Sequence, residues 1–209
     1  ALRDAARSGD ISIPIVAKPL DSEGSRGVIP ILGAGDLVKI DSLEYSPILV
    51  QEYIDGEDIG AGVYCCDGEI KAFVAFRYKR YTYFTFESKE IREGIEKLSV
   101  ATKANGILSF DMRVGLDGMV YWLECNPRFF YSMYMTLLAG IPLVEFGLPN
   151  WNVSGPNTLP SGTNVRRCRA MPFELIRPWR LTRLDVGYLR NLCADPVPRL
   201  REILRIERD

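Results

Sequence analysis

The sequence predicts an α+β protein whose sheets are largely antiparallel. Short β-rich segments follow one another across the turn signals Asp67-Gly68 and Asp117-Gly118, which join neighbouring strands into hairpins. Separate segments in which apolar residues recur at helical spacing stand between these strands. A chain of 209 residues, 47% hydrophobic and 25% charged, has the composition of a globular protein of one ordinary or two small domains.

The first part of the chain predicts a short helix and a few strands. The expected elements are a helix over 1–9 that ends at Gly9, a β-rich run over 11–19, a Gly/Ser-rich loop over 20–30, a short helix or turn over 36–46 and a strand over 47–54. Asp55-Gly56 is then expected to turn the chain.

The middle of the chain predicts two hairpins and a longer helix. The expected elements are strands over 58–66, 69–80 and 81–87, a helix over 88–106, a hairpin within 110–129 and a helix over 131–140. Ser88 is the expected N-cap of the long helix, and Ile91, Ile95 and Leu98 form its apolar face. In the first hairpin Tyr64 is expected opposite Lys71. Residues 150–163 have the composition of a linker.

The second hairpin has an unusual pairing of acids. A two-residue type I′ turn centred between Asp117 and Gly118 fixes which residues oppose each other. The predicted pairs are Ser109–Asn126, Phe110–Cys125, Asp111–Glu124, Met112–Leu123, Arg113–Trp122 and Val114–Tyr121. The apolar residues then share one face, but the other face sets the carboxylates of Asp111 and Glu124 directly across from each other, which is destabilising unless something compensates.

Three arrangements would relieve the repulsion between these acids. They share a proton, or Arg113 or Arg128 neutralises them, or they bind a hard cation. The amide oxygen of Asn126 beside them is a ligand that Mg²⁺ accepts, and it adds no charge. The alternative is an exposed hairpin whose acids simply face water.

The residue inventory restricts the chemistry. The chain has no histidine, which excludes Ser-His and Cys-His nucleophiles and His-ligated zinc. Its five cysteines form no C-x-x-C pair, and Cys65 and Cys66 are expected to be core residues of a strand. Carboxylates, Lys, Arg, backbone amides and a bound cation remain as the chemical groups.

Two further segments carry polar groups in a suggestive order. Lys18 closes a β-run and is followed by Gly24, Ser25, Arg26 and Gly27, whose amides and charges suit phosphate oxygens, although a plain loop has the same composition. Downstream, Glu52, Glu57 and Asp58 bracket an Asp-Gly turn at the end of an apolar strand. Such acids can accept hydrogen bonds from a nucleoside, and a solvated strand end is the alternative.

Taken together, the three segments resemble the ATP-grasp superfamily over about residues 10–148. The resemblance rests on "KPLDSEGSRGV", on "QEYIDGED" and on Asp-x(12)-Glu-x-Asn, extended here as "LECNPRF". It implies two antiparallel-sheet subdomains that hold a nucleotide between them. The expected divisions are a partial lid subdomain over 1–54, a palm subdomain with the metal site over 55–149 and a basic C-terminal extension over 150–209, and departures from the pattern lean toward the carbamoyl-phosphate-synthetase-like branch.

The resemblance also implies a role for each matching residue. Lys18 is expected to contact the α- and β-phosphates, and the loop residues Gly24, Ser25, Arg26 and Gly27 are expected to lie over the phosphates. Adenine is expected to contact Glu52, Tyr53 and Ile54, and the ribose is expected to contact Glu57 or, preferably, Asp58. Mg²⁺ is expected to bind Asp111, Glu124 and Asn126, the transferred phosphoryl group is expected to contact Arg128, and a further basic contact is expected from Arg77, Lys79 and Arg80. Lys18 and Arg128 are the expected catalytic residues.

The implied activity is an ATP- and Mg²⁺-dependent ligase that activates a carboxylate as an acyl phosphate for attack by an amine, with Mn²⁺ as an alternative ion. The second hypothesis is a regulatory ATP-binding module without catalysis. The expected partners are a small carboxylic acid, an amine, a missing N-terminal subdomain or partner chain and a second copy in a homodimer. The expected location is the cytoplasm, with no membrane partner. Residues 150–209 carry 11 Arg and no Lys against 6 acids, and we expect this surface to pack or to bind an acidic substrate rather than nucleic acid.

Overall fold

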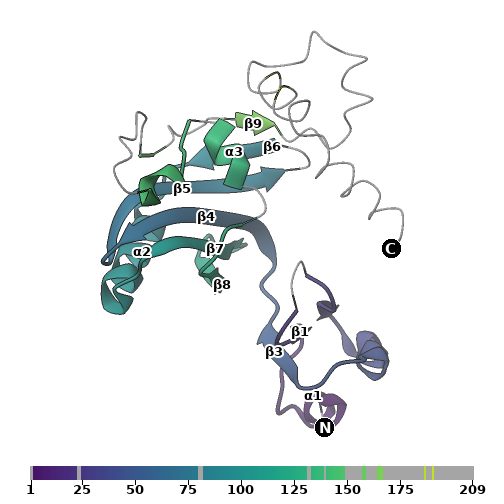
Figure 1. The fold of residues 1–209 in the computed structure, drawn as a ribbon. Helices are drawn as coiled ribbons and strands as arrows, with labels where there is room; N and C mark the ends of the chain where they lie inside the picture. The colour runs from purple at the N-terminus through teal and green to yellow at the C-terminus, as the bar shows by residue number, and fades with distance from the viewer. Residues whose placement is uncertain are drawn as a thin grey trace. The chain divides into compact units, whose positions relative to one another are not determined.

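The computed structural model describes residues 2–22, 25–79, 82–130, 133–138, 140–148, 157–158, 164–166, 186 and 190. The chain divides into two compact units, Ala1–Asp55 and Gly56–Asp209 (Figure 1). Each unit contains an antiparallel sheet with helices beside it, so the predicted α+β class is confirmed. The predicted division at residues 54, 149 and 209 stays a prediction, since most of residues 150–209 lies outside the described part.

The first unit holds a three-stranded sheet in the order β2-β1-β3. Its elements are α1 (Leu2–Ser8), β1 (Ile15–Pro19), β2 (Ile29–Ile31), the 3₁₀ helix η1 (Ala34–Ser42) and β3 (Ile48–Glu52). Both neighbours run antiparallel to β1. Ile15, Ile31 and Leu37 form the buried core. Gly9 ends α1 with a φ of 85°, as the sequence predicts.

The second unit is built on a six-stranded sheet in the order β8-β7-β4-β5-β6-β9. Its elements are β4 (Gly56–Cys66), β5 (Glu69–Lys79), β6 (Thr82–Phe86), α2 (Lys89–Thr102), β7 (Gly106–Gly115), β8 (Val120–Asn126), α3 (Met133–Leu138), the 3₁₀ helix η2 (Glu145–Gly147) and β9 (Asn164–Arg166). All strand pairings in this sheet are antiparallel.

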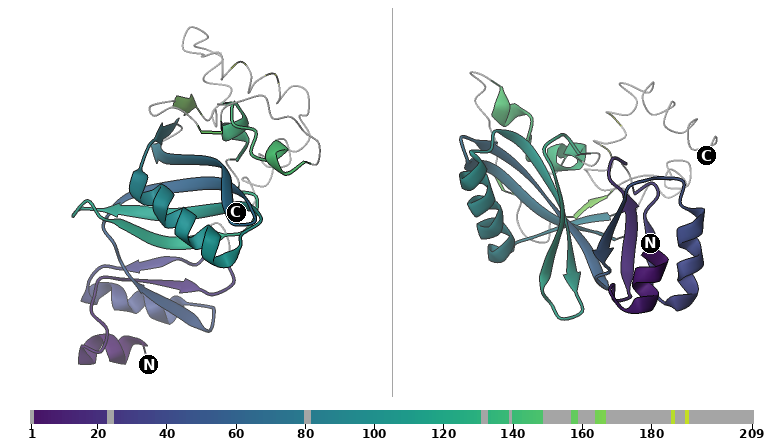
Figure 2. Two further views of the ribbon diagram at one scale, coloured as in Figure 1. Left: turned by 90° about the vertical axis from the view of Figure 1, so that its left-hand side faces the viewer. Right: turned by 90° about the horizontal axis from the view of Figure 1, so that it is seen from below.

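The two faces of this sheet have different covers. Helix α2 lies across one face (Figure 2), which we call the α2 face. Its core contains Ile59, Ala61 and Val63 of β4 with Phe110 and Met112 of β7. Because side chains alternate along a strand, the neighbouring residues of β4 and β7 point to the opposite face.

The opposite face is partly covered by a second, smaller core. There Ala72 and Val74 of β5 pack with Ile141 and Leu143, and Phe130 and Met133 adjoin them. We call this side the carboxylate face, because Asp58 and Asp111 belong to it by strand alternation. Segments far apart in the chain therefore cover the two faces separately.

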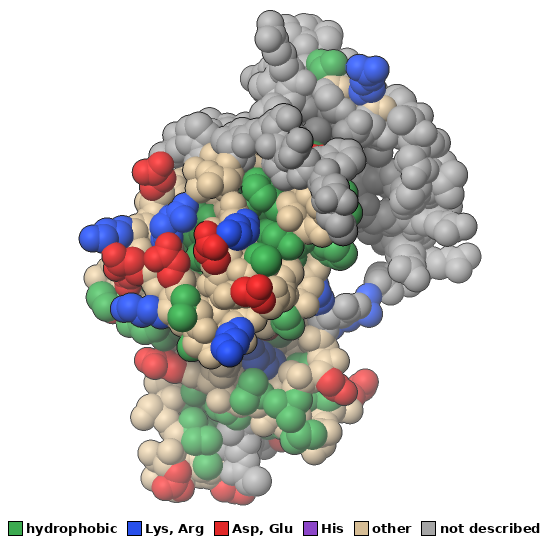
Figure 3. All heavy atoms as spheres, turned by 60° about the vertical axis from the view of Figure 1, so that its left-hand side comes forward, with side chains coloured by type: hydrophobic (Ala, Val, Ile, Leu, Met, Phe, Trp, Pro, Cys, Tyr) green, Lys and Arg blue, Asp and Glu red, His purple; other side chains and the backbone are tan. Residues whose placement is uncertain are grey.

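Helix α2 begins where predicted but ends at Thr102 rather than at 106, and its apolar face differs at one position. The Ser88 hydroxyl accepts a hydrogen bond from the Ile91 N–H at 3.3 Å, which confirms Ser88 as the N-cap. Ile91 and Ile95 are fully buried, whereas Leu98 is 40% exposed and Ser99 is buried in its place. The Ser99 hydroxyl lies 3.4 Å from the Cys65 sulfur. The buried strip Ile91, Ile95 and Ser99, in which each residue is four positions from the last, therefore ends on a polar contact. Figure 3 shows acidic and basic side chains interspersed over this side of the unit.

The first hairpin has the predicted turn but a shifted register. Asp67 and Gly68 both take positive φ, at 49° and 83°, which is the type I′ geometry. A bulge between Tyr64 and Cys65, in which Lys71 of β5 is the extra residue, sets Tyr64 opposite Ala72, so the predicted Tyr64–Lys71 pair is wrong. Cys66 is exposed, and only Cys65 is the core residue that the sequence predicts.

Asp55-Gly56 does not turn the chain as predicted. Gly56 begins β4 in the extended strand and pairs with Gly115 of β7. A Cβ atom at Gly56 would lie 1.9 Å from the Val114 carbonyl oxygen. Glycine is needed here because two backbones approach closely and no side chain fits between them.

None of the helices within the described residues is both long and apolar enough to cross a membrane.

Candidate functional site

The β7–β8 hairpin presents the opposed acids as predicted, although its turn differs. Ser109 pairs with Asn126, Phe110 with Cys125 and Asp111 with Glu124. The turn, however, has three residues, because the Gly115 N–H bonds to the Met119 carbonyl at 2.9 Å. Only Gly118 has positive φ, at 79°, so a type I turn with a glycine bulge replaces the predicted type I′ turn.

A second irregularity restores the register at the acids. Near the turn Met112 pairs with Trp122 and Val114 with Val120, one position away from the predicted pairs. The register shifts again between Met112 and Asp111, leaving Leu123 as the extra residue of a bulge. The predicted Asp111–Glu124 pair is therefore correct although the turn assumed for it is wrong.

The bulge also changes the face on which Trp122 lies. The sequence predicts Trp122 opposite Arg113 on the polar side. Instead its ring meets Phe110 edge-on, with centroids 5.7 Å apart, on the α2 face. A Cβ atom at Gly94 of α2 would lie 2.7 Å from this ring, so Gly94 gives the indole room beside the helix.

Asp111, Glu124 and Asn126 lie together on the carboxylate face. The two acids are exposed, and directly opposed residues of this kind have Cβ atoms about 5 Å apart. The Asn126 amide nitrogen donates to Glu124 Oε1 at 2.5 Å. A cation held by all three residues would need this amide to rotate so that its oxygen faces the carboxylates.

The donor set fits a hard cation. Two opposed carboxylates and one amide oxygen are the ligands that Mg²⁺ takes, and exposure leaves room for the waters and phosphate oxygens that usually complete its shell. Among the described residues no three Asp, Glu or Cys side chains gather around one point, so the protein would supply two charges and one neutral oxygen at most.

Asp58 and Glu57 point to opposite faces. Asp58 pairs with Arg113 across β4 and β7, and Arg113 Nη2 and Nε lie 2.6 and 2.7 Å from its Oδ1. Asp58 is on the carboxylate face, whereas Glu57 lies 3.5 Å from Arg77 on the α2 face. Of the two acids proposed for ribose, only Asp58 shares a face with the metal-ligand candidates.

Lys18 and the following loop belong to the first unit. Lys18 pairs with Leu49 of β3 and is partly exposed. In the loop, Ser25 and Gly27 have positive φ, at 61° and 73°, and the Tyr45 hydroxyl donates to the Gly27 carbonyl at 2.6 Å. Arg26 is exposed. Gly24, also predicted at this site, lies outside the described residues.

The candidate adenine contacts follow β3. Glu52 is exposed at the end of the strand. The Tyr53 N–H donates to the Pro14 carbonyl at 3.1 Å, so this amide is already used within the first unit.

The basic candidates of the second unit are exposed. Arg128 lies just after β8, and its Nη1 donates to the Phe129 carbonyl at 3.3 Å. Lys79 and Arg77 are at the exposed end of β5, and Arg80 lies outside the described residues. Arg77 forms an ion pair with Glu57 on the α2 face.

The sequence reasoning missed an aromatic row on the carboxylate face. The rings of Phe76 and Tyr83 have centroids 5.2 Å apart, those of Tyr78 and Tyr83 5.0 Å, and Phe130 stacks on Phe76 at 6.3 Å. A Cβ atom at Gly60 would lie 2.9 Å from the Phe76 ring. The signal available in the sequence was this glycine inside a strand, which marks a close approach.

Comparisons with known proteins bear on this geometry. A family model described as "ATP-grasp in the biosynthetic pathway with Ter operon" matches residues 44–168, more than half of the chain. The chain belongs to this ATP-grasp family. The predicted resemblance is thus confirmed, and members of the family are typically ATP-dependent carboxylate–amine ligases. A comparison with curated proteins found no match.

Solved ATP-grasp structures share the fold at low sequence identity. The biotin carboxylase of Campylobacter jejuni, in a β,γ-ATP complex, has a TM-score of 0.54 and 16% identity over 71% of this chain and 40% of its own. The biotin carboxylase domain dimer of Hydrogenobacter thermophilus 2-oxoglutarate carboxylase, with MgADP, ADP and bicarbonate, has a TM-score of 0.52 and 17% identity over 68% and 37%. The N5-carboxyaminoimidazole synthetase of Staphylococcus aureus has a TM-score of 0.52 and 12% identity over 78% and 47%. The chain spans less than half the length of these ATP-grasp structures.

The turn of the ATP-grasp hairpin holds an acid whose pKa can be tested. The Met119 N–H, at 3.0 Å, and then the Tyr121 hydroxyl, at 2.8 Å, lower the pKa of Asp117 from its ordinary value of 3.8. Since the folded-state pKa is the lower one, the carboxylate stabilises the fold fully above its unfolded-state pKa. This contribution is lost as pH falls through the folded-state value.

We therefore expect Tyr121→Phe to raise the pKa of Asp117 toward 3.8, because one donor is lost. The measurement is an NMR titration of the side-chain carboxyl carbon. Tyr45→Phe is the control, since it removes a tyrosine hydroxyl bond in the first unit and should leave Asp117 unchanged. A pKa of 3.8 or above in the unaltered protein would contradict the turn geometry.

Proposed function

We propose that the chain is the nucleotide- and metal-binding part of an ATP- and Mg²⁺-dependent ligase that joins a carboxylate to an amine. The observation that carries the proposal is the Asp111–Glu124 pair, held in register on an exposed sheet face with Asn126 beside it. Membership of the ATP-grasp family supports nucleotide binding. ATP and Mg²⁺ are the proposed cofactors, with Mn²⁺ as an alternative ion.

The proposed roles follow from charge. Asp111, Glu124 and Asn126 hold Mg²⁺, which when bound neutralises negative charge on the ATP phosphates. Lys18 and the amides of Ser25 and Gly27 contact phosphate oxygens. Arg128, at the exposed end of β8, stabilises the transferred phosphoryl group.

The nucleoside end of ATP has its own proposed contacts. The backbone of Tyr53 and Ile54 receives adenine, with Glu52 beside them. Asp58 accepts the ribose hydroxyls from its exposed side while Arg113 holds its carboxylate in place. Glu57 is not a ribose ligand in this proposal because it faces the other side of the sheet.

The reaction needs no histidine. The attacking group is the substrate carboxylate, which is already an anion at neutral pH and needs no general base. Its oxygen attacks the γ-phosphorus and the bond to the bridging oxygen breaks, giving an acyl phosphate and ADP. An amine then displaces phosphate. The residues of the chain align the reactants and balance charge.

The test combines binding and turnover on the full-length protein. Calorimetry should show ATP binding that strengthens at least about tenfold when Mg²⁺ is added, as expected for charge-assisted phosphate contacts. A screen of small carboxylic acids with amines should then find a pair that stimulates ADP release. ATP·Mg²⁺ binding with silence across the screen would favour the second hypothesis, a regulatory ATP-binding module, and absence of ATP binding would contradict both.

A further inference from the structure

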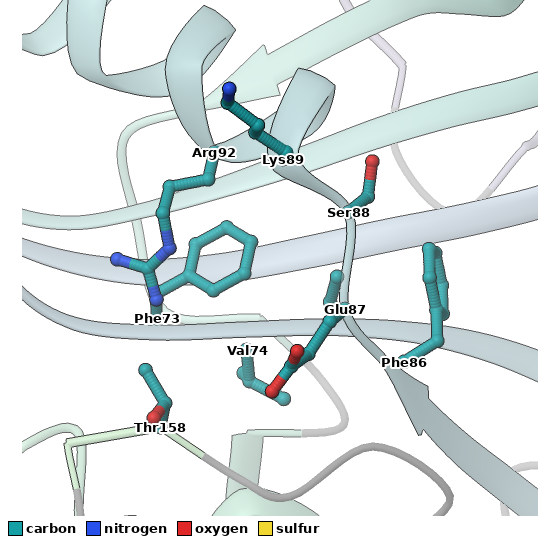
Figure 4. Close-up of a pocket in the computed structure, with 9 residues that line it drawn as sticks. Phe73, Val74, Phe86, Glu87, Ser88, Lys89, Arg92 and Thr158 are labelled. Carbon is teal, nitrogen blue, oxygen red and sulfur yellow. The ribbon is translucent and has the colours of Figure 1, made fainter.

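A cavity of about 310 Å³ opens on the α2 face of the second unit. It lies between β5, the end of β6, the start of α2 and Thr158 (Figure 4). Its walls are apolar on the strand side, formed by Phe73, Ala75 and Phe86, and polar on the helix side. Asp111 and Glu124 point to the other face of the sheet, so this cavity is separate from the candidate ATP site.

Arg92 supplies one charge to the cavity. Its guanidinium carbon lies 4.4 Å from the centroid of the Phe73 ring, a cation–π contact that holds the group beside the apolar wall. Within the described part of the chain no carboxylate forms an ion pair with Arg92. Arg77 is the natural comparison, because it sits over Phe86 at 5.2 Å but is already paired with Glu57 at 3.5 Å.

Glu87 supplies the opposite charge. It follows β6 directly, is exposed, and its carboxylate points into the space between Arg92, Thr158 and Phe86 (Figure 4). No described Lys or Arg forms an ion pair with it. Lys89, by contrast, pairs with Glu93 at 3.6 Å and its ammonium points away from the other lining side chains.

One cation, one anion and an apolar wall around a small volume define a ligand. A guanidinium can bind a carboxylate through two parallel N–H···O bonds, and a carboxylate opposite it suits an ammonium. The aromatic wall suits an aliphatic or aromatic side chain. The volume is at the lower end of small-molecule pockets, which fits a ligand of amino-acid size.

We propose that this cavity binds a free α-amino acid with an apolar side chain, with its carboxylate on Arg92, its ammonium on Glu87 and its side chain against Phe73 and Phe86. The site is additional to the proposed ATP site and does not depend on the ligase activity.

The test uses L-leucine as the probe, with two analogues that each lack one charge. Calorimetry or ligand-observed NMR on the full chain should show L-leucine binding with a Kd of about 1 mM, as a ligand of this size allows. Leucinamide, which lacks the carboxylate, and 4-methylpentanoate, which lacks the ammonium, should each bind at least about tenfold more weakly.

Variants assign the two charges. Arg92→Ala should weaken L-leucine binding at least about tenfold, while Lys89→Ala, which removes a cation whose ammonium points away from the other lining side chains, should leave it unchanged. Glu87→Gln should remove the preference for L-leucine over 4-methylpentanoate.

Three results would overturn the proposal: no saturable L-leucine binding up to about 20 mM, well above the expected Kd; equal binding of L-leucine and 4-methylpentanoate, which would indicate a simple anion site; and unchanged binding in Arg92→Ala. The analogue series is measured on the unaltered protein, so the proposal stays testable if a variant folds poorly. None of these readouts requires ATP turnover.

Discussion

Glu124→Gln is expected to reduce Mg²⁺-dependent ADP release at least about 100-fold while leaving the protein as stable as before or more stable. The substitution keeps the size of the side chain and removes one of the two charges proposed to hold Mg²⁺. About 2.7 kcal/mol of transition-state stabilisation corresponds to this loss of rate.

The free energy of unfolding gives this prediction a second, independent readout. In the absence of metal, Asp111 and Glu124 are like charges directly opposed on neighbouring strands. Neutralising one should raise the free energy of unfolding by up to about 1 kcal/mol, measured by urea denaturation without Mg²⁺. A merely structural acid would give the opposite sign.

Glu96→Gln is the matched control, because Glu96 is an exposed acid on α2, which covers the other face of the sheet. It should change neither ADP release nor the Mg²⁺ dependence. Full activity in Glu124→Gln, or a loss of stability in the absence of metal, would refute the role proposed for the acid pair.

Gly56→Ala is expected to destabilise the second unit by about 2–4 kcal/mol. The added Cβ would lie 1.9 Å from the Val114 carbonyl oxygen and 2.8 Å from its carbon. Both atoms belong to the backbone of a central strand, so no side-chain rotation relieves the overlap. The measurement is the midpoint of thermal or urea unfolding.

The position of Gly56 links this clash to the proposed site. Gly56 pairs with Gly115, two residues before the Asp58–Arg113 pair. Moving β4 away from β7 here should also weaken ATP binding. Gly35→Ala is the control, since a Cβ at Gly35 meets nothing within 4 Å and should change stability by less than about 0.5 kcal/mol. Equal effects of the two substitutions would contradict the close approach.

Much of the fold could be predicted because local signals agree with the tertiary structure. Ser88 precedes a periodic apolar strip, and the structure has a helix capped at that residue. Asp67-Gly68 forms the type I′ turn that its sequence favours. The predicted Asp111–Glu124 pair is correct because the extra residue at Leu123 offsets the extra residue in the turn.

The errors have a common physical cause. Asp117-Gly118 has the same residues as the first turn, but the Asp117 side chain accepts hydrogen bonds from Met119 and Tyr121 and favours a three-residue loop. The predicted pairs assume regular strands, and the bulges between Tyr64 and Cys65 and between Asp111 and Met112 shift them. Long-range contacts decide such bulges, and a single sequence does not display them.

The candidate site was likewise predictable from the sequence only in part. Its acids could be predicted from spacing within one hairpin, but the separation of Glu57 from Asp58 by strand alternation became clear only with the neighbouring strands in place. The aromatic row of Phe76, Tyr78 and Tyr83 has no local pattern of its own, because its members meet across two strands.

The extra residue at Leu123 has a consequence for how this hairpin tolerates changes in length. The three-residue tip and the acid-bearing half follow different registers, and the bulge joins them. Deleting Leu123 would make Trp122 and Glu124 neighbours in a regular strand, where alternation keeps them on the opposite faces that they occupy now, so the Met112–Trp122 and Asp111–Glu124 pairs should both persist. We therefore expect the shortened hairpin to keep both its three-residue tip and its opposed acids without a compensating deletion of Leu116.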